Sequence, residues 1–494
     1  MPNLTKVESV LSSFAILMRQ SIMLLTALLT SLGAATGGLA QSAVDDAGAG
    51  SPGPAVLYTG ARLLTAAGPE SDVEFEIENA AMLVEDGRIA ALGPVGGISV
   101  PAGTTTVSLA GKTIMPAMID AHAHLGYEGY TSWGAGNYSR KNLADHLDHY
   151  SYYGFSAVFS AGSDPHQLAL SIQQDQQQGS LGGARFLFAA GMAPPGQGPN
   201  DRFLEQALAI EARTGMTVLT GLADTEQAVA AAEAVAGEGI PFIKIWVDDR
   251  GGSQEKLAPG IYRPLLGAAR RLGLRVFVHQ QYASDMPDLL EAGVNGFLHG
   301  RLGADLDRRL ADRIAAAGAF VVPNLGLGEL RFEPVADDPF LQETLPPAVV
   351  ARLRDAFSQR RVTPPGPGQE LQLRESMGHL LAAGVEILLG TDAGAVPDHF
   401  FGYTGHRELE IFVRLGMSPR QAIIAATRSP AQRLGLDDLG TLEVGKQADF
   451  IVLDANPLDD IRNTRSISLV FQGGRSLDRQ ALAEHWRAAG PAAP

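Results

Sequence analysis

The stretch MPAMIDAHAHL, residues 115–125, decides the fold prediction, because an apolar strand runs directly into two histidines. The apolar run Thr113–Ile119 predicts a buried strand that ends at Asp120 and is followed by His122 and His124. Side chains two residues apart on a strand point to the same face, so both imidazoles can aim at one point. Neutral imidazole is a good ligand for first-row metals. The motif alone fits either a metal site or a buried polar pair, and other motifs in the chain are needed to distinguish these two interpretations.

The middle of the chain alternates apolar strands with helical runs. Two of these runs, residues 226–239 and 304–318, end at a glycine, which favours the end of a helix. Apolar strands separated by helices predict a parallel sheet covered on both faces. Eight of them predict an α/β fold of the (β/α)8 TIM-barrel type, with a doubly wound sheet as the alternative. The predicted strands are Thr113–Ile119, Ala157–Ser160, Arg185–Ala189, Phe242–Val247, Arg275–His279, Gly296–His299, Phe320–Val322 and Val385–Leu389.

Both ends of the chain carry short strands in which apolar and polar residues alternate between Gly, Pro and Asp-Gly turns. The pair Asp86-Gly87 is typical of a β-hairpin turn. Because the same pattern returns near the C-terminus, we expect one small β-sandwich domain built from both termini. The predicted segments are a signal peptide (1–40), a linker (41–54), a composite β-sandwich (55–114 and 432–482) and the barrel (115–431).

The composition describes a globular protein and excludes several classes of function. A chain of 494 residues is long for a single core, which favours two domains. The net charge of −16 argues against a nucleic-acid partner, whose phosphates it would repel. The chain has no cysteine, which excludes disulfides, thiolate metal sites and cysteine nucleophiles.

The first forty residues have the pattern of an export signal. Arg19 precedes the apolar run Ile22–Leu39, and small residues around Ala40 suit a cleavage site. We therefore expect an exported protein, periplasmic or secreted, with no stable membrane span after cleavage. The alternative is a transmembrane anchor, for which the apolar core is short.

Four further strands of the predicted barrel carry side chains that can bind a metal. Lys244 lies in the fourth strand, His279 and His299 end the fifth and sixth, and Asp392 follows the eighth. The chemistry of such barrels takes place at the carboxyl ends of the strands. A polar group at the end of an apolar strand is unfavourable unless it is paired or ligated. We therefore interpret these side chains, with the two histidines of the first strand, as one metal centre rather than as packing.

Lys244 allows two interpretations. It is flanked by apolar residues, so burial should lower its pKa and free the amine. A free amine can react with CO₂ to give a carbamate, an anionic ligand that could bridge two metals. Alternatively, the ammonium pairs with Asp248 or another carboxylate, and spacing alone does not decide.

Several motifs together resemble those of the metal-dependent amidohydrolase superfamily. The resemblance is closest to its imidazolonepropionase-like branch, which contains prolidase-like dipeptidases and the amidase that degrades ochratoxin. It covers nearly everything after Ala55 and implies a metal-bearing barrel with a split β-sandwich. The motifs are PAMIDAHAH (116–124), IKIW (243–246), His279, His299, GTDAG (390–394), HRELEIFVRLGMSPRQAIIAAT (406–427) and GTLEVGKQADFIVLDANPLDD (440–460).

The resemblance also implies roles for these residues. Two divalent metal ions, Zn²⁺ by expectation, would be the cofactors, with a CO₂-derived carbamate on Lys244 bridging them. His122 and His124 would bind the more buried ion, which Asp392 would also bind while serving as general base. His279 and His299 would bind the second ion. The predicted catalytic residues are Asp392, His299 and His406; the last could face the substrate, bond Asp392, or lie in solvent at a helix N-terminus.

The implied function is hydrolysis of an amide or peptide-like C–N bond by a metal-bridging hydroxide. The substrate would be a small molecule of the dipeptide or N-acyl amino acid class, and a homo-oligomer is left open. The alternatives are a lactonase, esterase or phosphotriesterase-like hydrolase, a deaminase, or an inactive binding relative. Imidazolonepropionase lacks the bridging lysine, so Lys244 argues against that activity.

Other residues are candidates for binding the substrate. Arg301 could hold a carboxylate. An aromatic loop after the first strand could wall a pocket or simply pack. The long proline-rich insertion Asn324–Gly368 follows the seventh strand, where such loops often form lids. The aromatic residues of the loop are Tyr127, Tyr130, Trp133 and Tyr138.

Overall fold

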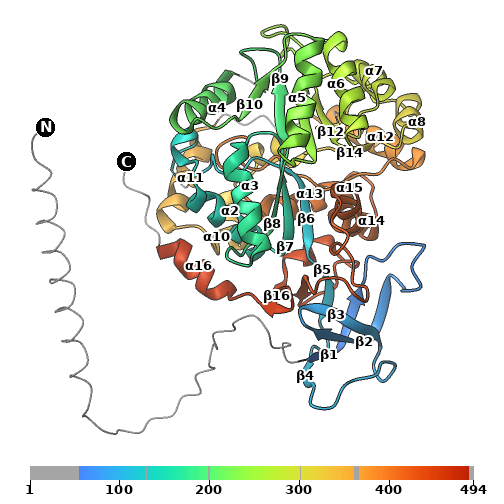
Figure 1. Cartoon of the computed structure of the whole chain (residues 1–494). Coiled ribbons are helices and arrows are strands. Elements are labelled where there is room, and N and C mark those ends of the chain that lie inside the picture. Colours follow the sequence, from blue (N-terminus) through green and yellow to red (C-terminus); the bar gives the residue numbers. More distant parts are fainter. Residues whose placement is uncertain (1–54, 130, 199–200, 301, 361–365, 489–494) are drawn as a thin grey trace, which may run out of the picture. The chain divides into compact units, whose positions relative to one another are not determined.

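A computed structural model describes residues 55–129, 131–198, 201–300, 302–360 and 366–488 (Figure 1). These residues belong to one unit of the chain, Pro52–Pro494. The predicted signal peptide (1–40) and linker (41–54) lie outside the described residues. Among the helices that are described, none combines the length and the apolar character needed to cross a bilayer.

One eight-stranded sheet is built from both ends of the chain. Its order is β17-β16-β15-β5-β1-β2-β3, with β4 on β1, and the antiparallel pair β5–β15 joins the N-terminal and C-terminal strands. Asp86 (φ 49°) and Gly87 (φ 74°) form the predicted turn between β2 and β3 in left-handed conformations. The strands are β1 (Val56–Leu64), β2 (Glu76–Glu85), β3 (Arg88–Pro94), β4 (Thr105–Ser108), β5 (Thr113–Pro116), β15 (Phe450–Leu453), β16 (Ile467–Gln472) and β17 (Arg475–Ser476).

Two parallel sheets occupy the middle of the chain, so the fold is mixed α/β, as predicted. Their orders are β6-β7-β8 and β10-β9-β11-β12-β13-β14. Every residue of β6, β7 and β11 is buried, because helices cover these strands. The strands are β6 (Met118–Ala123), β7 (Phe155–Ser160), β8 (Arg185–Phe188), β9 (Ala190–Ala193), β10 (Leu219–Gly221), β11 (Phe242–Val247), β12 (Arg275–Gln280), β13 (Gly296–Leu298) and β14 (Phe320–Val322).

The helices begin and end where local chemistry favours it. Asp224 and Asp307 cap α5 and α8 by accepting hydrogen bonds from the backbone of the first turn. The α-helices are α2 (Arg140–Tyr152), α3 (His166–Gln177), α4 (Asp201–Thr214), α5 (Thr225–Gly237), α6 (Pro259–Arg271), α7 (Met286–Ala292), α8 (Arg308–Ala316), α9 (Gly326–Glu329), α10 (Pro339–Gln342), α11 (Pro347–Gln359), α12 (Pro367–Ala383), α13 (Tyr403–Arg414), α14 (Pro419–Ala426), α15 (Arg428–Leu434) and α16 (Arg479–Ala488). Short 3₁₀ helices are η1 (Ala135–Asn137), η2 (Ala283–Asp285), η3 (Leu330–Phe332), η4 (Val335–Asp337) and η5 (Ile461–Arg465).

The predicted first strand, Thr113–Ile119, is wrong as a single element. It divides into β5, in the eight-stranded sheet, and β6, in a parallel sheet. Ala117 N–H donates to Asp449 O (3.0 Å), whereas Met118 N–H donates to Gly154 O (2.9 Å), so the backbone changes partners between these two residues. Both halves are buried, so the apolar pattern continues through the change unbroken.

The predicted eighth strand, Val385–Leu389, is not a regular strand in the structure. It nevertheless bonds to the backbone on both sides: Leu388 N–H donates to Val321 O of β14 (3.0 Å), and Ala121 N–H of β6 donates to Leu389 O (2.9 Å). The segment therefore lies between β14 and β6 and carries the following residues to the same edge as the ends of those strands.

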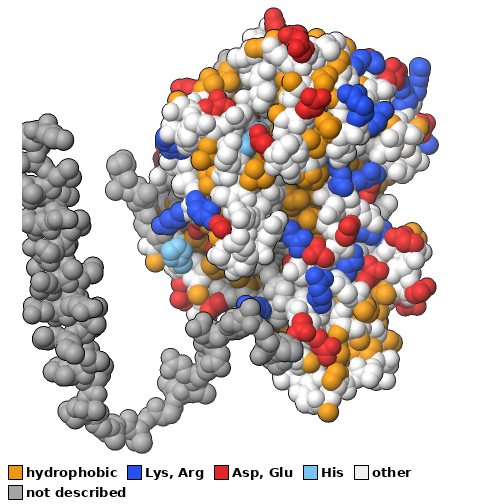
Figure 2. Space-filling view, viewed as in Figure 1, with side chains coloured by type: hydrophobic (Ala, Val, Ile, Leu, Met, Phe, Trp, Pro, Cys, Tyr) orange, Lys and Arg blue, Asp and Glu red, His pale blue; other side chains and the backbone are white. Residues whose placement is uncertain are grey.

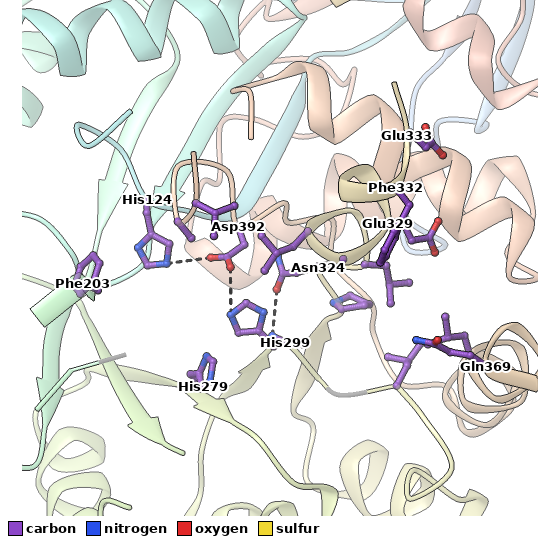
Figure 3. A pocket seen from close by; sticks show the side chains of 18 of the residues that line it. His124, Phe203, His279, His299, Asn324, Glu329, Phe332, Glu333, Gln369 and Asp392 are labelled. Carbon is purple, nitrogen blue, oxygen red and sulfur yellow. Dashed lines mark hydrogen bonds and ion pairs between the residues drawn. The ribbon is translucent and has the colours of Figure 1, made fainter. Parts of the chain in front are cut away.

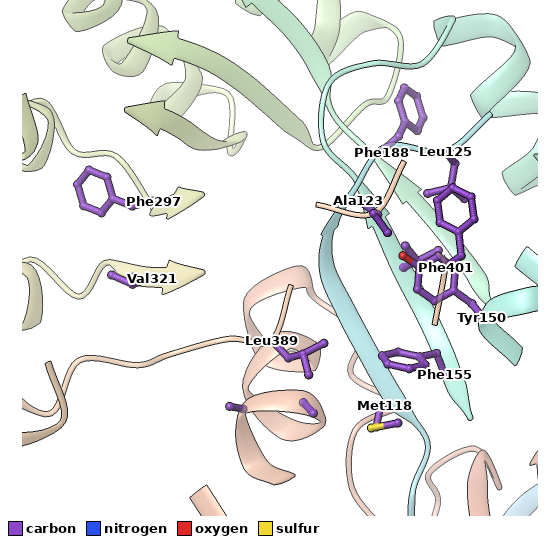
Figure 4. Packing of buried hydrophobic residues seen from close by; sticks show 14 of the residues in the cluster. Met118, Ala123, Leu125, Tyr150, Phe155, Phe188, Phe297, Val321, Leu389 and Phe401 are labelled. Carbon is purple, nitrogen blue, oxygen red and sulfur yellow. The ribbon is translucent and has the colours of Figure 1, made fainter. Parts of the chain in front are cut away.

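Large apolar side chains fill the space between the strands and the surrounding helices (Figure 4). Met118, Phe155 and Leu389 are fully buried near the start of β6, with Tyr150 of α2 alongside. At about 25 cal/mol per Å² of buried apolar surface, such packing is the main stabilising contribution to the fold. On the face shown in Figure 2, acidic and basic side chains are interspersed.

Candidate metal centre

Four of the predicted ligands meet at the carboxyl ends of β6 and β13 and in the loop after residue 389. Asp392 Oδ1 lies 3.3 Å from His122 Nε2 and 3.1 Å from His124 Nε2. Asp392 Oδ2 lies 3.6 Å from His299 Nε2 (Figure 3). One nitrogen or oxygen from each of His122, His299 and Asp392 can be chosen so that all three lie within 4.8 Å of one another. This spacing suits the side chains of one metal centre.

Asp120 fixes β6 to the loop that carries Asp392. Its Oδ1 accepts hydrogen bonds from His122 N–H (3.0 Å) and Thr391 N–H (3.1 Å). Its Oδ2 accepts from Tyr150 O–H (2.8 Å) and from the Thr391 hydroxyl (2.6 Å). Burial raises the pKa of Asp120 to about 6 despite these bonds. The four bonds join the backbones on either side of the cluster and hold His122 and Asp392 in register.

Three residues at the cluster have a left-handed backbone. His299 (φ 76°), Asn324 (φ 52°) and Asp392 (φ 60°) each turn the chain at or just after the end of a strand or strand-like segment. Side chains rarely adopt this conformation without local support, and it is commonly found at functional sites. Here it directs three side chains from different segments toward one region.

Lys244 reaches the same region from the middle of β11. Its side chain is fully buried, and Nζ has no hydrogen-bond partner among the described residues. Burial lowers the pKa of Lys244 from 10.5 to about 7, although Asp392 partly opposes this shift. Gly162 (φ 82°) makes room for the lysine, because a Cβ atom there would lie 2.8 Å from Lys244 Cβ.

Asp248 pairs with His279 and Arg250 rather than with Lys244. Its Oδ2 lies 2.8 Å from His279 Nε2 and 3.0 Å from Arg250 Nε. The ammonium pairing with Asp248 that the sequence left open for Lys244 is therefore absent from the described residues. A carboxylate on Nε2 favours the tautomer in which that nitrogen carries the proton, which leaves His279 Nδ1 free to act as a ligand.

The donor set fits a cation chemically. Burial lowers the pKa values of His122, His279 and His299, so the imidazoles are neutral at pH 7 and have lone pairs to offer. Burial opposes ionisation of Asp392, but the attraction between its carboxylate and a protonated neighbouring histidine, together with a hydrogen bond from His124, brings its pKa well below the usual value. His122 Nε2 and Asp392 Oδ1, like Lys244 Nζ, are buried without hydrogen-bond partners in the described part of the chain. Unsatisfied buried donors and acceptors are rare, and a bound cation would satisfy these.

A cavity of about 930 Å³ opens above the cluster. His124, Lys244, His279, His299 and Asp392 line it. The predicted insertion 324–368 contributes one wall through residues of α9 and η3, as Figure 3 shows for Glu329 and Phe332. A second cavity of about 670 Å³ shares part of this wall.

The structure does not bring His406 to the cluster. His406 is fully buried in α13, where its Nδ1 lies 3.0 Å from Thr464 Oγ1 and its Nε2 lies 2.8 Å from Tyr153 O. It does not line the cavity. Its sequence position near Asp392 suggested a catalytic role, but the helix directs the imidazole toward η5 instead. The arrangement favours a structural role.

Replacing His406 by alanine should therefore destabilise the fold and leave catalysis nearly unchanged. Loss of both hydrogen bonds and of buried volume should lower the free energy of unfolding by about 2 kcal/mol. Urea denaturation measures this change, and kcat/KM should stay within about threefold of the wild type. A folded, metal-loaded variant with kcat/KM reduced a hundredfold would restore a catalytic role.

The aromatic loop packs instead of lining the cavity. Tyr127 stacks on Trp133 and donates to Ser163 O (2.6 Å), and Tyr138 donates to Asp164 (2.6 Å). Tyr130 and Arg301 lie outside the described residues.

Asn324 is a residue of the cluster to which sequence reasoning gave no role. Its Oδ1 lies 2.9 Å from His122 Nδ1 and accepts from His299 N–H (3.2 Å). Its sequence position could have identified it, because Asn324 follows the strand Phe320–Val322 just as Asp392 follows the segment 385–389.

Comparison with known proteins identifies the family of this chain. Residues 202–473, more than half of the chain, match the amidohydrolase family. The chain belongs to that family. It is 26% identical over 437 residues to an imidazolonepropionase of Maricaulis maris, with 87% of this chain and 99% of the relative covered. This membership indicates hydrolytic chemistry at C–N bonds.

Solved structures show the same fold. A Xaa-Pro dipeptidase is 23% identical, with 86% of this chain and 99% of that one covered and a TM-score of 0.63. The A. niger ochratoxinase is 21% identical, with coverages of 86% and 95% and a TM-score of 0.64. The fold of this chain is accordingly TIM-barrel-like. The predicted membership of the amidohydrolase superfamily is confirmed, and the imidazolonepropionase relatives agree with the predicted branch.

Proposed function

We propose that this protein is a binuclear-metal hydrolase that cleaves an amide or peptide-like C–N bond of a dipeptide or N-acyl amino acid. The observation that carries the proposal is the convergence, next to one cavity, of buried nitrogen and oxygen atoms that lack hydrogen-bond partners. His122 Nε2, Lys244 Nζ and Asp392 Oδ1 have no hydrogen-bond partner among the described residues. A purely structural cluster would not leave three such atoms together.

The residues present would hold two divalent ions, Zn²⁺ by the chemistry of nitrogen and carboxylate ligands. His122, His124 and Asp392 would bind one ion, and His279 and His299 the other. Such ions would supply a water of lowered pKa and a Lewis acid for the carbonyl group.

Lys244 would join the two ions as a carbamate. In this step the neutral Nζ attacks the carbon of CO₂, an N–C bond forms as one C=O π bond breaks, and the amine gives up a proton to water, which leaves a carbamate whose single negative charge is shared by two oxygens. The pKa of about 7, the burial of the lysine and the space left by Gly162 support this proposal.

Asp392 would move the proton. Its pKa lies well below the usual value, so it is ionised at neutral pH, and the ionised carboxylate is the form that can accept a proton from the attacking water. As the C–N bond breaks, the same carboxyl group can return the proton to the leaving nitrogen. His299, 3.6 Å away, orients the carboxylate.

We further propose that the parallel strands close into a (β/α)8 barrel. The backbone bonds from segment 385–389 to β14 and β6 support closure on one side. On the other side, β8 and β9 are joined by the single residue Ala189, whose N–H donates to Ser160 O of β7 (3.1 Å). The composite β-sandwich (55–114 and 432–482) and the barrel (115–431) remain our proposed domains.

We also propose, from residues 1–40, that the protein is exported to the periplasm or beyond. Mass spectrometry of the mature N-terminus tests this proposal, and an intact Met1 would contradict it.

The test of the function is a screen of the zinc-loaded protein against dipeptides, N-acyl amino acids and lactones. Because the second cavity adjoins the first, acyl groups of increasing length belong in the set. We expect hydrolysis of amides, and none after the metal is removed by a chelator. Hydrolysis confined to lactones or phosphotriesters would support the alternative reading, since the same ligands could serve either electrophile.

A further inference from the structure

We propose that Asn324 is a catalytic residue, whose Nδ2 donates a hydrogen bond to the carbonyl oxygen of the substrate during hydrolysis. The inference rests on the proposed function, because it assigns a role in the same reaction. The two ends of the Asn324 side-chain amide have different surroundings.

The oxygen end of the amide is fixed by two neighbours. Asn324 Oδ1 lies 3.2 Å from His299 N and 2.9 Å from His122 Nδ1. Because a backbone N–H can only donate, the atom that faces it must be the accepting oxygen. His122 Nδ1 must then carry a proton and donate it to the same oxygen. That tautomer leaves the lone pair of His122 on Nε2, which faces Asp392.

The nitrogen end has no partner. Asn324 Nδ2 is buried and lacks a hydrogen-bond partner within the described residues, although the side chain is only 5% exposed. The side chain lines the cavity next to His299 (Figure 3). An amide with a satisfied oxygen and an unsatisfied nitrogen in the wall of a cavity is typical of a donor that awaits a ligand.

The backbone holds this donor rigidly. Asn324 has a left-handed conformation (φ 52°), and the next two residues donate their N–H groups to the buried carboxyl group of Glu408. Glu408 therefore fixes the start of α9 directly after Asn324. A donor held in place before the substrate arrives needs no reorganisation during the reaction.

The reaction creates a partner for such a donor. When water adds to the carbonyl carbon, the π electron pair moves to the carbonyl oxygen, which gains negative charge. The C–N bond then breaks, the carbonyl re-forms, and the proton accepted by Asp392 passes to the leaving nitrogen. The hydrogen bond from a neutral N–H group to that oxygen is stronger in the transition state than in the ground state.

The decisive variant is Asn324→Asp, tested in the full-length, zinc-loaded protein. Aspartate keeps an oxygen for His122 Nδ1 and His299 N–H, and it replaces the N–H donor by an acceptor. We expect kcat to fall about 100-fold on the best amide from the screen, while KM changes little. Zinc stoichiometry and thermal unfolding should match the wild type. Calorimetry with methylphosphonate, a tetrahedral oxyanion, should show binding weakened about tenfold.

The outcomes separate the donor role from a structural one. If Asn324 only positions His122 and His299, Asn324→Asp keeps both contacts, and wild-type kcat and methylphosphonate affinity would overturn the inference. Asn324→Ala removes both ends of the amide, so it should lose zinc as well as activity. If the wild type hydrolysed no amide, the proposed function would fail on its own, and methylphosphonate binding would still test the donor.

Discussion

Replacing Asp392 by asparagine should lower kcat/KM by about 10⁴-fold without unfolding the protein. The asparagine side chain has the same shape and keeps one oxygen for the contacts at 3.1 Å and 3.3 Å to the two histidines of β6. It cannot accept a proton from water at neutral pH, and general acid–base catalysis of this kind contributes up to about 10⁴-fold. Steady-state kinetics and metal analysis by mass spectrometry measure the two effects, and the variant should still bind metal.

A matched control is Asp398→Asn. Asp398 also has a left-handed backbone (φ 62°), but it pairs with Arg352 and lines the second cavity instead of the one above the histidines, so the comparison uses a substrate with a short acyl group. Its kcat/KM should stay within about threefold of the wild type, because a substitution away from the reacting groups has a small effect. If Asp392→Asn retained wild-type turnover, Asp392 would have no role as a base. If it lost all metal, the carboxylate would be needed for binding, and the rate would say nothing of proton transfer.

The elements that the sequence predicted best are short apolar strands, whose pattern follows from burial alone. Phe242–Val247 and Phe320–Val322 have the predicted bounds, because each is a short apolar run with a helix on either side. Parallel strands place their carboxyl ends at one edge, so polar residues at those ends could be grouped without knowledge of the fold. The structure brings His122, His124, His299 and Asp392 together in this way.

Other features depend on contacts that periodicity does not encode. The strand Thr113–Ile119 changes sheets at Ala117, and both halves are equally buried. His406 was chosen for its position in the sequence, yet the face of α13 that it occupies is set by packing against η5. Asn324 was interpreted as the start of a loop because prolines follow it, although it also ends a strand. Its contacts reach His122, which is 202 positions away along the chain, and His299, which is 25 positions away.

Replacing Lys244 by methionine should abolish most activity and yet make the metal-free protein more stable. Methionine has a similar length but cannot form a carbamate, so we expect one bound zinc or none and a loss of kcat/KM of about 10³-fold or more. Lys112→Met is the control, because Lys112, just before β5, pairs with Asp454, just after β15, and its replacement should leave activity and zinc content unchanged. Two bound zinc ions and wild-type rates in Lys244→Met would contradict a bridging role.

The stability of the metal-free protein gives an independent measurement with a definite sign. The pKa of Lys244 falls from 10.5 to about 7 in the folded state, so between these pH values the unfolded chain binds the proton that the folded chain has lost. The free energy of unfolding should therefore rise as the pH increases from about 7 to about 10, and the burial of the ammonium should be most unfavourable below pH 7. In chelator at about pH 6, Lys244→Met should be more stable than the wild type by on the order of 3 kcal/mol, and its stability should lack this pH dependence. Urea denaturation across this pH range measures the stability difference and its pH dependence. If Lys244→Met were less stable than the wild type at about pH 6, the burial of the Lys244 ammonium would not destabilise the metal-free protein.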